Sequence, residues 1–147
     1  MKTRKTAAIA AMFLLGGCAV LAPPIEVAGT WIGDLAWVAG DPLAGFEEPL
    51  SLILEQTGSE VTGSVILQGP SATSLTVPVE TGNAGRRSMD LRAAGPVTVG
   101  SQVVSITVTL VGELEEGLLT GTGTRIVNGD AHDFEWSARR TAPPATP

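Results

Sequence analysis

The chain has 147 residues, with 9 basic and 15 acidic side chains and a formal net charge of −6. One domain is the natural expectation at this length, and the single cysteine excludes an internal disulfide and any multi-cysteine zinc site. The negative charge argues against nucleic acid as a partner, because nucleic acid requires a basic surface. One histidine and no tyrosine leave few groups for acid–base chemistry.

Residues 1–17 have the layout of a secretory signal peptide. A start with three basic residues is followed by an apolar run over residues 7–15, which is too short to span a bilayer. The sequence LGGC at 15–18 resembles a bacterial lipobox. The resemblance implies cleavage before Cys18 and acylation of Cys18, for example with palmitate. An ordinary cleaved signal with an incidental cysteine is the alternative.

The lipobox resemblance also implies where the protein resides. A lipid anchor would hold it on the extracytoplasmic side of a membrane. This is the periplasmic face of the outer membrane in a Gram-negative organism, or otherwise the cell surface. Residues 18–27, which contain Pro23-Pro24, are expected to form the acylated tether, and residues 141–147 a disordered tail.

Residues 28–140 are expected to fold as one all-β domain. They show no convincing helical period, and short runs of alternating apolar and polar residues are separated by Gly, Pro, Asn and Asp. Eight strands are predicted, at about 29–38, 49–57, 60–68, 74–81, 87–94, 101–112, 118–127 and 130–140.

The strongest turn signal is Asn128-Gly129, a pair typical of a two-residue type I′ hairpin. The turn fixes the register, with one apolar face on which aromatic rings cover glycines and one polar face. The predicted facing pairs on the apolar side are Arg125 with His132, Gly123 with Phe134 and Gly121 with Trp136.

A second hairpin is predicted to turn at Gly58-Ser59, with Gly first as a type II′ turn prefers. Its predicted inner pairs are Leu50 with Leu67, Leu52 with Val65, Leu54 with Gly63 and Gln56 with Val61. The outer face is largely polar. Two independent registers that both separate apolar from polar residues support the strand assignment.

Eight consecutive amphipathic strands with mostly short turns form either an up-and-down barrel or a β-sandwich. We expect an eight-stranded antiparallel barrel, because closure removes exposed sheet edges. The predicted inward residues are Leu50, Leu52, Leu54, Val61, Val65, Leu67, Leu75, Val77, Val79, Met89, Leu91, Val104, Ile106, Val108, Leu110, Leu119, Phe134 and Trp136.

The two ends of the β domain resemble the calycin group, which contains the lipocalins. Gly29-Thr30-Trp31 opens the first strand, and the run from Trp136 to Arg140 closes the last. In that group, Gly-x-Trp begins strand one, and an Arg near the end of the last strand packs across the Trp. The resemblance implies a lipocalin-like barrel closed at one end by Gly29, Trp31, Trp136 and Arg140. Arg140 lies on the same face of the strand as Trp136, because the two are an even number of residues apart. This favours Arg140 as the partner of Trp31, with Arg139 as the alternative.

The opposite end of the barrel, its mouth, holds the candidate ligand-binding residues. Arg125 and His132 are the only inward basic groups that can be placed near it, beneath the acidic loop 39–48. In one interpretation, Arg125 pairs with a loop carboxylate and holds the mouth shut. In the other, Arg125 and His132 contact the polar end of an apolar ligand, with Phe46 as a third candidate.

No metal, cofactor or catalytic site is expected. Because successive side chains of a strand point to opposite faces, Asp133 and Glu135 are on the other face from His132. That histidine is therefore left without convergent metal ligands. No nucleophile–base pair and no fixed pair of carboxylates can be recognised.

We therefore expect a membrane-anchored binding module and not an enzyme. The barrel either holds a small apolar ligand, as the calycin resemblance implies, or is solid and binds a protein partner through its loops. An interior of eight strands is compatible with both. No cluster of inward polar groups can be recognised, so we do not expect a polar ligand site deep inside the barrel.

Overall fold

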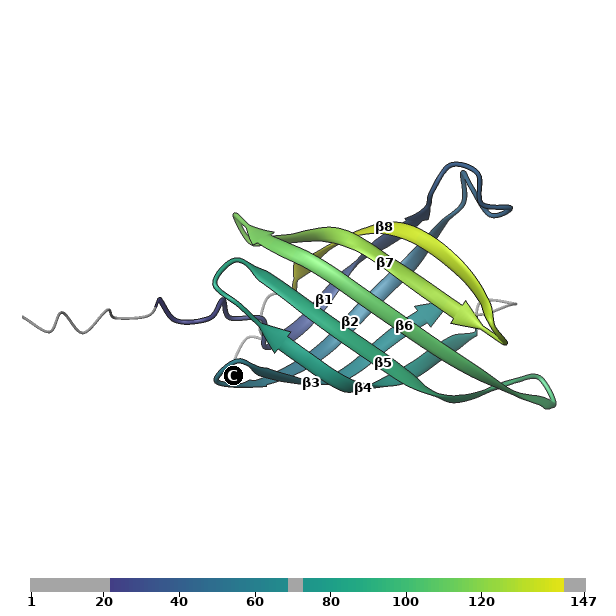
Figure 1. The fold of residues 1–147 in the computed structure, drawn as a ribbon, viewed down its shortest axis with the longest axis horizontal. Coiled ribbons are helices and arrows are strands. Elements are labelled where there is room, and N and C mark those ends of the chain that lie inside the picture. Colours follow the sequence, from purple (N-terminus) through teal and green to yellow (C-terminus); the bar gives the residue numbers. More distant parts are fainter. Residues whose placement is uncertain (1–21, 69–72, 142–147) are drawn as a thin grey trace, which may run out of the picture.

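The computed structural model describes residues 22–68 and 73–141, and in these ranges the protein is an all-β barrel (Figure 1). Eight antiparallel strands follow one another around the barrel, and β1 pairs with β8 to close it. The predicted fold class is confirmed. The strands are β1 (Gly29–Trp37), β2 (Glu47–Thr57), β3 (Glu60–Gln68), β4 (Ser74–Ala84), β5 (Ser88–Val99), β6 (Gln102–Glu115), β7 (Leu118–Val127) and β8 (Asp130–Arg140).

Both predicted hairpin registers are confirmed. In the β7–β8 hairpin, Arg125 is opposite His132 and Gly121 is opposite Trp136. Asn128 and Gly129 have φ of 50° and 91°, as a type I′ turn requires. In the β2–β3 hairpin, every predicted inner pair from Leu50–Leu67 to Gln56–Val61 is present.

The core lies inside the barrel and contains almost all of the predicted inward residues. Only Val79 and Val104 of that set are partly buried rather than buried. Additional buried residues that the pattern did not predict as inward are Val27, Leu35, Trp37, Ala84, Ala93, Val97 and Ala138. Trp31, predicted from the family resemblance, is also buried.

Aromatic rings cover glycines on the inner wall, but not entirely as predicted. A Cβ atom added to Gly123 would lie 2.5 Å from the Phe134 ring, so Phe134 covers the glycine opposite it. The indole of Trp136 extends past its partner Gly121 to Gly112 on β6, where an added Cβ would lie 2.6 Å from the ring. The missing side chains thus create the space that the two rings fill.

Strands β5 and β6 are longer than predicted, because they end at Val99 and Glu115 rather than at about residues 94 and 112. Pro96 lies within β5 opposite Ser105, and the hairpin turns only after Val99. At the other end of β6, Glu116 and Gly117 both have positive φ and form a two-residue turn. Proline was the misleading signal, because it usually interrupts a strand.

Strand β4 contains an irregularity that changes which side chains face inward. Its register with β5 shifts between Val79 and Thr81, so that the buried residue at its end is Ala84. A bulge of this kind places two residues opposite one and reverses the alternation beyond it. Strict alternation could not predict Ala84 as a core residue.

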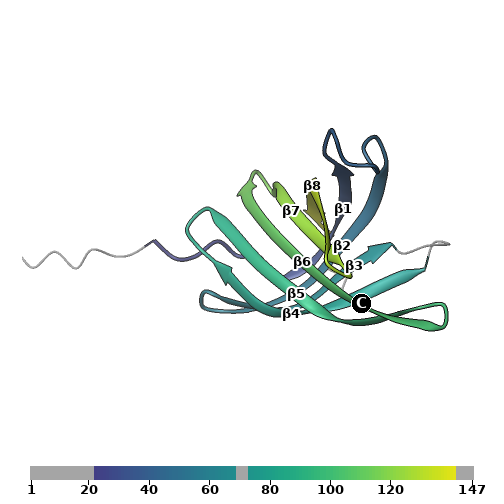
Figure 2. The same ribbon diagram turned by 45° about the vertical axis from the view of Figure 1, so that its right-hand side comes forward.

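The barrel has a floor, formed where β2–β3, β4–β5 and β6–β7 connect, and a mouth at the opposite end. Figures 1 and 2 show the purple chain segment entering at the floor, while the β1–β2 and β5–β6 connections project at the mouth. Because consecutive strands are antiparallel neighbours, the connections alternate between the two ends.

The segment before β1 packs on the floor, which corrects the prediction that residues up to 27 form a tether. Val27 is fully buried, and its N–H donates to the Gln56 side chain at 2.7 Å. Gln56 in turn donates to the carbonyl of Ile25, and the N–H of Ile25 donates to the carbonyl of Gly85. The β domain therefore begins at about Ile25 rather than at residue 28.

Candidate ligand site at the barrel mouth

One ion pair and one contact between a histidine and a carboxylate connect the end of the β7–β8 hairpin to the β1–β2 side of the mouth. Arg125 donates from Nη1 to Oε2 of Glu48 at 3.1 Å, and both side chains are largely buried. Nδ1 of His132 lies 2.8 Å from Oδ2 of Asp41. The structure thus brings Arg125 and His132 together, and each contacts a carboxylate that belongs to β2 or to the β1–β2 connection.

Asp41 is fixed in the loop by its own backbone as well as by His132. The N–H of Leu43 donates to Oδ1 of Asp41 at 2.8 Å. This backbone bond is the main cause that lowers the pKa of Asp41 below its ordinary value of 3.8, and the contact with His132 lowers the pKa further. The carboxylate form of Asp41 is therefore part of the folded arrangement of the loop.

Trp37 forms the centre of the mouth and was not predicted as an inward residue. The guanidinium carbon of Arg125 lies 4.3 Å from the centroid of the Trp37 ring. The rings of His132 and Phe134 meet Trp37 edge-on, at centroid distances of 5.9 and 5.5 Å. The sequence signal that could have placed Trp37 inside is its even spacing from Trp31 and Leu35, because side chains an even number of residues apart share one face of a strand.

A pocket of about 460 Å³ opens beside this cluster. Its walls are mainly apolar, with a few polar groups at the edge, which is the usual composition of small-molecule sites. The lining residues are Leu43, Glu48, Gln68, Leu75, Val99, Val104, Ile106, Arg125, Val127 and Asn128.

Of the three predicted ligand-binding residues, only Arg125 lines this pocket. His132 is set back from it and contacts Asp41 and Trp37 instead. Phe46 is 65% exposed in the loop and does not line this pocket. Leu43 is the loop residue that packs against the core and borders the pocket. The positions of side chains in a loop are set by tertiary contacts, which the alternation of residues along a strand does not encode.

Of the four residues that the family resemblance places at the closed end, three lie together, namely Gly29, Trp31 and Arg140. The guanidinium carbon of Arg140 is 4.8 Å from the Trp31 ring centroid, and Nη2 of Arg140 donates to the carbonyl of Glu26. Gly29 has a φ of 120°, a conformation that favours glycine, and borders the Arg140 side chain. Arg140 rather than Arg139 is therefore the partner of Trp31. Trp136 lies on the inner wall, with Nε1 donating to the carbonyl of Thr122.

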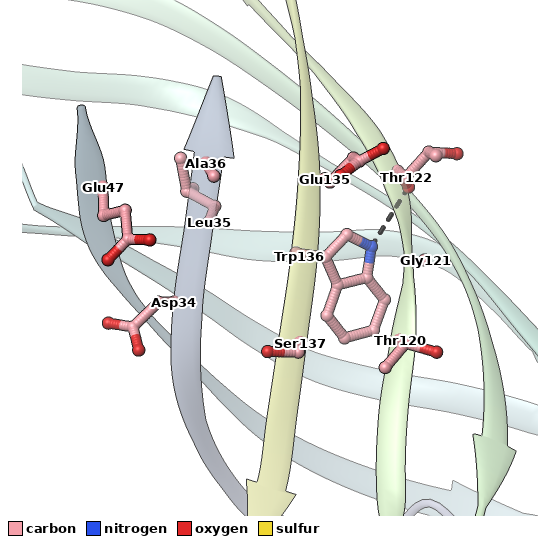
Figure 3. Close-up of a pocket in the computed structure, with 10 residues that line it drawn as sticks. All are labelled: Asp34, Leu35, Ala36, Glu47, Thr120, Gly121, Thr122, Glu135, Trp136 and Ser137. Carbon is pink, nitrogen blue, oxygen red and sulfur yellow. Dashed lines mark hydrogen bonds between the residues drawn. The ribbon is translucent and has the colours of Figure 1, made fainter. Parts of the chain in front are cut away.

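A second hollow, of about 530 Å³, lies across β1, β7 and β8 (Figure 3). Its rim carries the carboxylates of Asp34, Glu47 and Glu135, with the indole of Trp136 between the strands. Among residues 22–68 and 73–141, no group of three or more His, Cys, Asp or Glu side chains is placed to hold a metal ion. None of the described residues that line the hollow is basic.

Several predictions of the N-terminal segment lie outside the described residues, namely the signal peptide 1–17 and the acylated Cys18. The predicted tail is described only at Thr141, which donates to the carbonyl of Thr30. In the part of the chain that the structure describes, no helix has the length and apolar character needed to cross a membrane.

Comparison with known proteins does not assign the chain to a family. No protein-family model matches it, and no curated protein matches it either.

Proposed function

We propose that the protein is a lipid-anchored, extracytoplasmic β-barrel that binds a small apolar ligand at its mouth. The observation that carries the proposal is the 460 Å³ pocket, whose walls are mostly Leu, Val and Ile side chains and whose edge holds Arg125. Below the pocket the barrel is filled by buried apolar side chains, so the ligand occupies the mouth and not the whole interior.

The anchor is the second part of the proposal and is supported by sequence alone. The basic start, the short apolar run and LGGC at 15–18 support cleavage before Cys18 and acylation of Cys18. No catalytic role is proposed.

The ligand pocket is tested with N-phenylnaphthylamine, an uncharged fluorescent probe that brightens in apolar surroundings. Wild-type protein should enhance its fluorescence saturably. Val104 lines the pocket, so Val104→Trp should fill the space and weaken binding at least about tenfold, a loss of about 1.4 kcal/mol. Val103 is the adjacent residue on β6 and is 72% exposed, so Val103→Trp is the matched control and should bind as wild type does.

Absence of saturable binding to the wild type would overturn the proposed ligand site. Equal binding by the Val104→Trp and Val103→Trp variants would also overturn it, because the probe would then occupy another surface.

Phe46 supports a second candidate, interaction with a protein partner through the loops. Its aromatic side chain is 65% exposed in the connection between β1 and β2, while its backbone N–H is held by the carbonyl of Leu43. Exposed aromatic residues are typical anchors of protein interfaces. Native mass spectrometry of the barrel purified from its own host distinguishes the two candidates: a retained small molecule supports the pocket, and a retained protein supports the loops.

A further inference from the structure

The outer face of strands β1 to β3 carries a patch of three isoleucine side chains, the isoleucine patch. Ile32 on β1 is 55% exposed, Ile53 on β2 is 47% exposed, and Ile66 on β3 is partly exposed. The strand registers place Ser51 between Ile32 and Ile66, and they place Ile53 diagonally next to both. Side chains at diagonal positions of neighbouring strands are about 7–8 Å apart, so the three isoleucines lie within reach of one another.

The cross-strand neighbours of the isoleucines on β1 to β4 are uncharged. Thr30 and Ser64 are opposite Ile53 on its two sides, and Ser51 and Thr76 are opposite Ile66. The exposed outer positions of β5, β6 and β8, by contrast, include the charged residues Asp90, Arg92, Glu113, Asp133 and Glu135. Exposed apolar patches rimmed by polar residues are typical of interaction sites.

Three charged side chains border the isoleucine patch. Arg139 on β8 is opposite Ile32, one strand away from it. Glu55 follows Ile53 by two positions on β2, so it points to the same outer face. Asp34 lies two positions from Ile32 toward the mouth. Arg139 and Glu55 are both exposed, and neither forms an ion pair with another residue that the structure describes, so both charges can meet a partner.

The positions of Arg139 and Glu55 relative to the isoleucines are complementary. The step from Ile32 to Arg139 crosses one strand, about 4.8 Å, and the step from Ile53 to Glu55 is two residues along a strand, about 6.8 Å. The two steps have similar lengths and run nearly at right angles. A two-fold axis that lies in the interface, passes between Ile32 and Ile53 and runs diagonally across the strands therefore turns one step into the other.

We propose that the isoleucine patch binds a second copy of the chain and forms a symmetric homodimer. Ile32 of each chain packs on Ile53 of the other, and Arg139 of each chain pairs with Glu55 of the other. Each contact occurs twice, because a two-fold interface uses the same surface of both chains. The net charge of −6 disfavours contact between two copies elsewhere, whereas this face offers both signs of charge at matching positions.

Cross-linking of one introduced cysteine to itself tests the second copy. Ser51 lies beside the expected axis, so a short bis-maleimide should join Ser51→Cys residues of two chains in cells that produce the full-length protein. Val111→Cys is the matched control, because Val111 is 54% exposed on β6, across the barrel from β2 (Figure 1). The wild type, whose only cysteine is Cys18, gives the background. We expect a product of twice the chain mass for Ser51→Cys only.

Substitutions in the Ser51→Cys protein test the apolar contact. Ile53→Glu places a carboxylate in it, so the cross-linked product should fall at least about tenfold. Val111→Glu, which adds the same charge on the opposite wall, should change nothing. Both replaced side chains are exposed, so the fold should be retained.

A charge exchange tests the two-fold arrangement. Arg139→Glu alone places like charges against each other and should lower the cross-linked product about tenfold. The double variant with Arg139→Glu and Glu55→Arg restores opposite signs, and its product should return to within about twofold of the starting protein. A merely structural role for either residue would not produce this rescue.

The opposing results are distinct. No product from Ser51→Cys, equal products from Ser51→Cys and Val111→Cys, or a product that Ile53→Glu leaves unchanged would overturn the interface. A product that joins the chain to a different protein would overturn the second copy as the partner. Failure of the charge exchange to restore the product would overturn the two-fold arrangement. None of these results depends on the ligand pocket, which is tested separately.

Discussion

Gly121 has no room for even one additional methyl group. A Cβ atom built on it would lie 1.8 Å from the carbonyl oxygen of Val111 and 2.6 Å from the Cα atom of Gly112. Both obstacles are backbone atoms of the neighbouring strand, so rotating a side chain cannot relieve them. The substitution Gly121→Ala must instead move β7 away from β6.

The expected cost of Gly121→Ala is about 3 kcal/mol. Overpacking a core typically costs about 1–3 kcal/mol, and the upper end applies because backbone must move. Separation of the strands would also weaken ladder hydrogen bonds, at about 0.5–1.5 kcal/mol each. Urea unfolding followed by tryptophan fluorescence measures the effect, as a lower midpoint with an unchanged slope.

Gly85→Ala is the matched control. An added Cβ at Gly85 would lie 3.5 Å from its nearest neighbour, the carbonyl oxygen of Ser88, which is ordinary van der Waals contact. We expect a change within about 0.5 kcal/mol. Thr122→Ser, next to Gly121 but on the polar face, should be equally mild. If the stability of Gly121→Ala is within about 0.5 kcal/mol of the wild type, the close approach of the β6 backbone to Gly121 is refuted.

Three further predictions concern the floor, the loop and the anchor. Gln56→Ala removes the acceptor of the Val27 N–H, which should cost about 1–3 kcal/mol and speed amide exchange at Val27, measured by NMR. Because the folded pKa of Asp41 is lowered, its stabilising contribution is present above pH 3.8 and lost as pH falls through the folded pKa. Its carboxyl carbon should therefore titrate below 3.8 by NMR, and Asp41→Asn should remove this part of the acid sensitivity. Cys18→Ser should abolish acylation and release the protein from membranes, measured by fractionation and mass spectrometry of the product.

Each of these three has a clear opposing result. Unchanged exchange at Val27 would show that the Gln56 bond does not hold the floor. A midpoint for Asp41 at or above 3.8 would contradict the hydrogen bond from Leu43. Normal processing and membrane association of Cys18→Ser would exclude the lipoprotein assignment.

Local sequence signals were sufficient for the strands and for two registers. Asn128-Gly129 and Gly58-Ser59 specify their turns, and a two-residue turn fixes every pair beyond it. The alternation of apolar and polar residues then identified the inner wall, because a slip by one residue would have exposed it. The pattern was compatible with a barrel or a β-sandwich, and the pairing of β1 with β8 shows that the sheet closes into a barrel.

Features that depend on distant contacts were missed. Val27 follows a Pro-Pro pair typical of a linker, yet it is buried because Gln56, 29 residues away, binds its backbone. The contact between His132 and Asp41 spans 91 residues, and no local pattern encodes it. Small core residues such as Ala93 and Ala138 gave little apolar signal. Arg125 was found because its register was fixed, whereas Phe46 lies in a loop without a register.

Both ends of the described chain leave the barrel at the floor, where Ile25 is bonded to Gly85 and Thr141 to Thr30. Ile25 comes seven positions after Cys18, so an anchor on Cys18 would hold the floor within about 25 Å of the lipid. The barrel would then stand upright on the membrane with its mouth directed into the aqueous compartment. Ligand exchange would take place with carriers or molecules on that side, and a direct route from the bilayer into the pocket would be blocked by the body of the barrel itself.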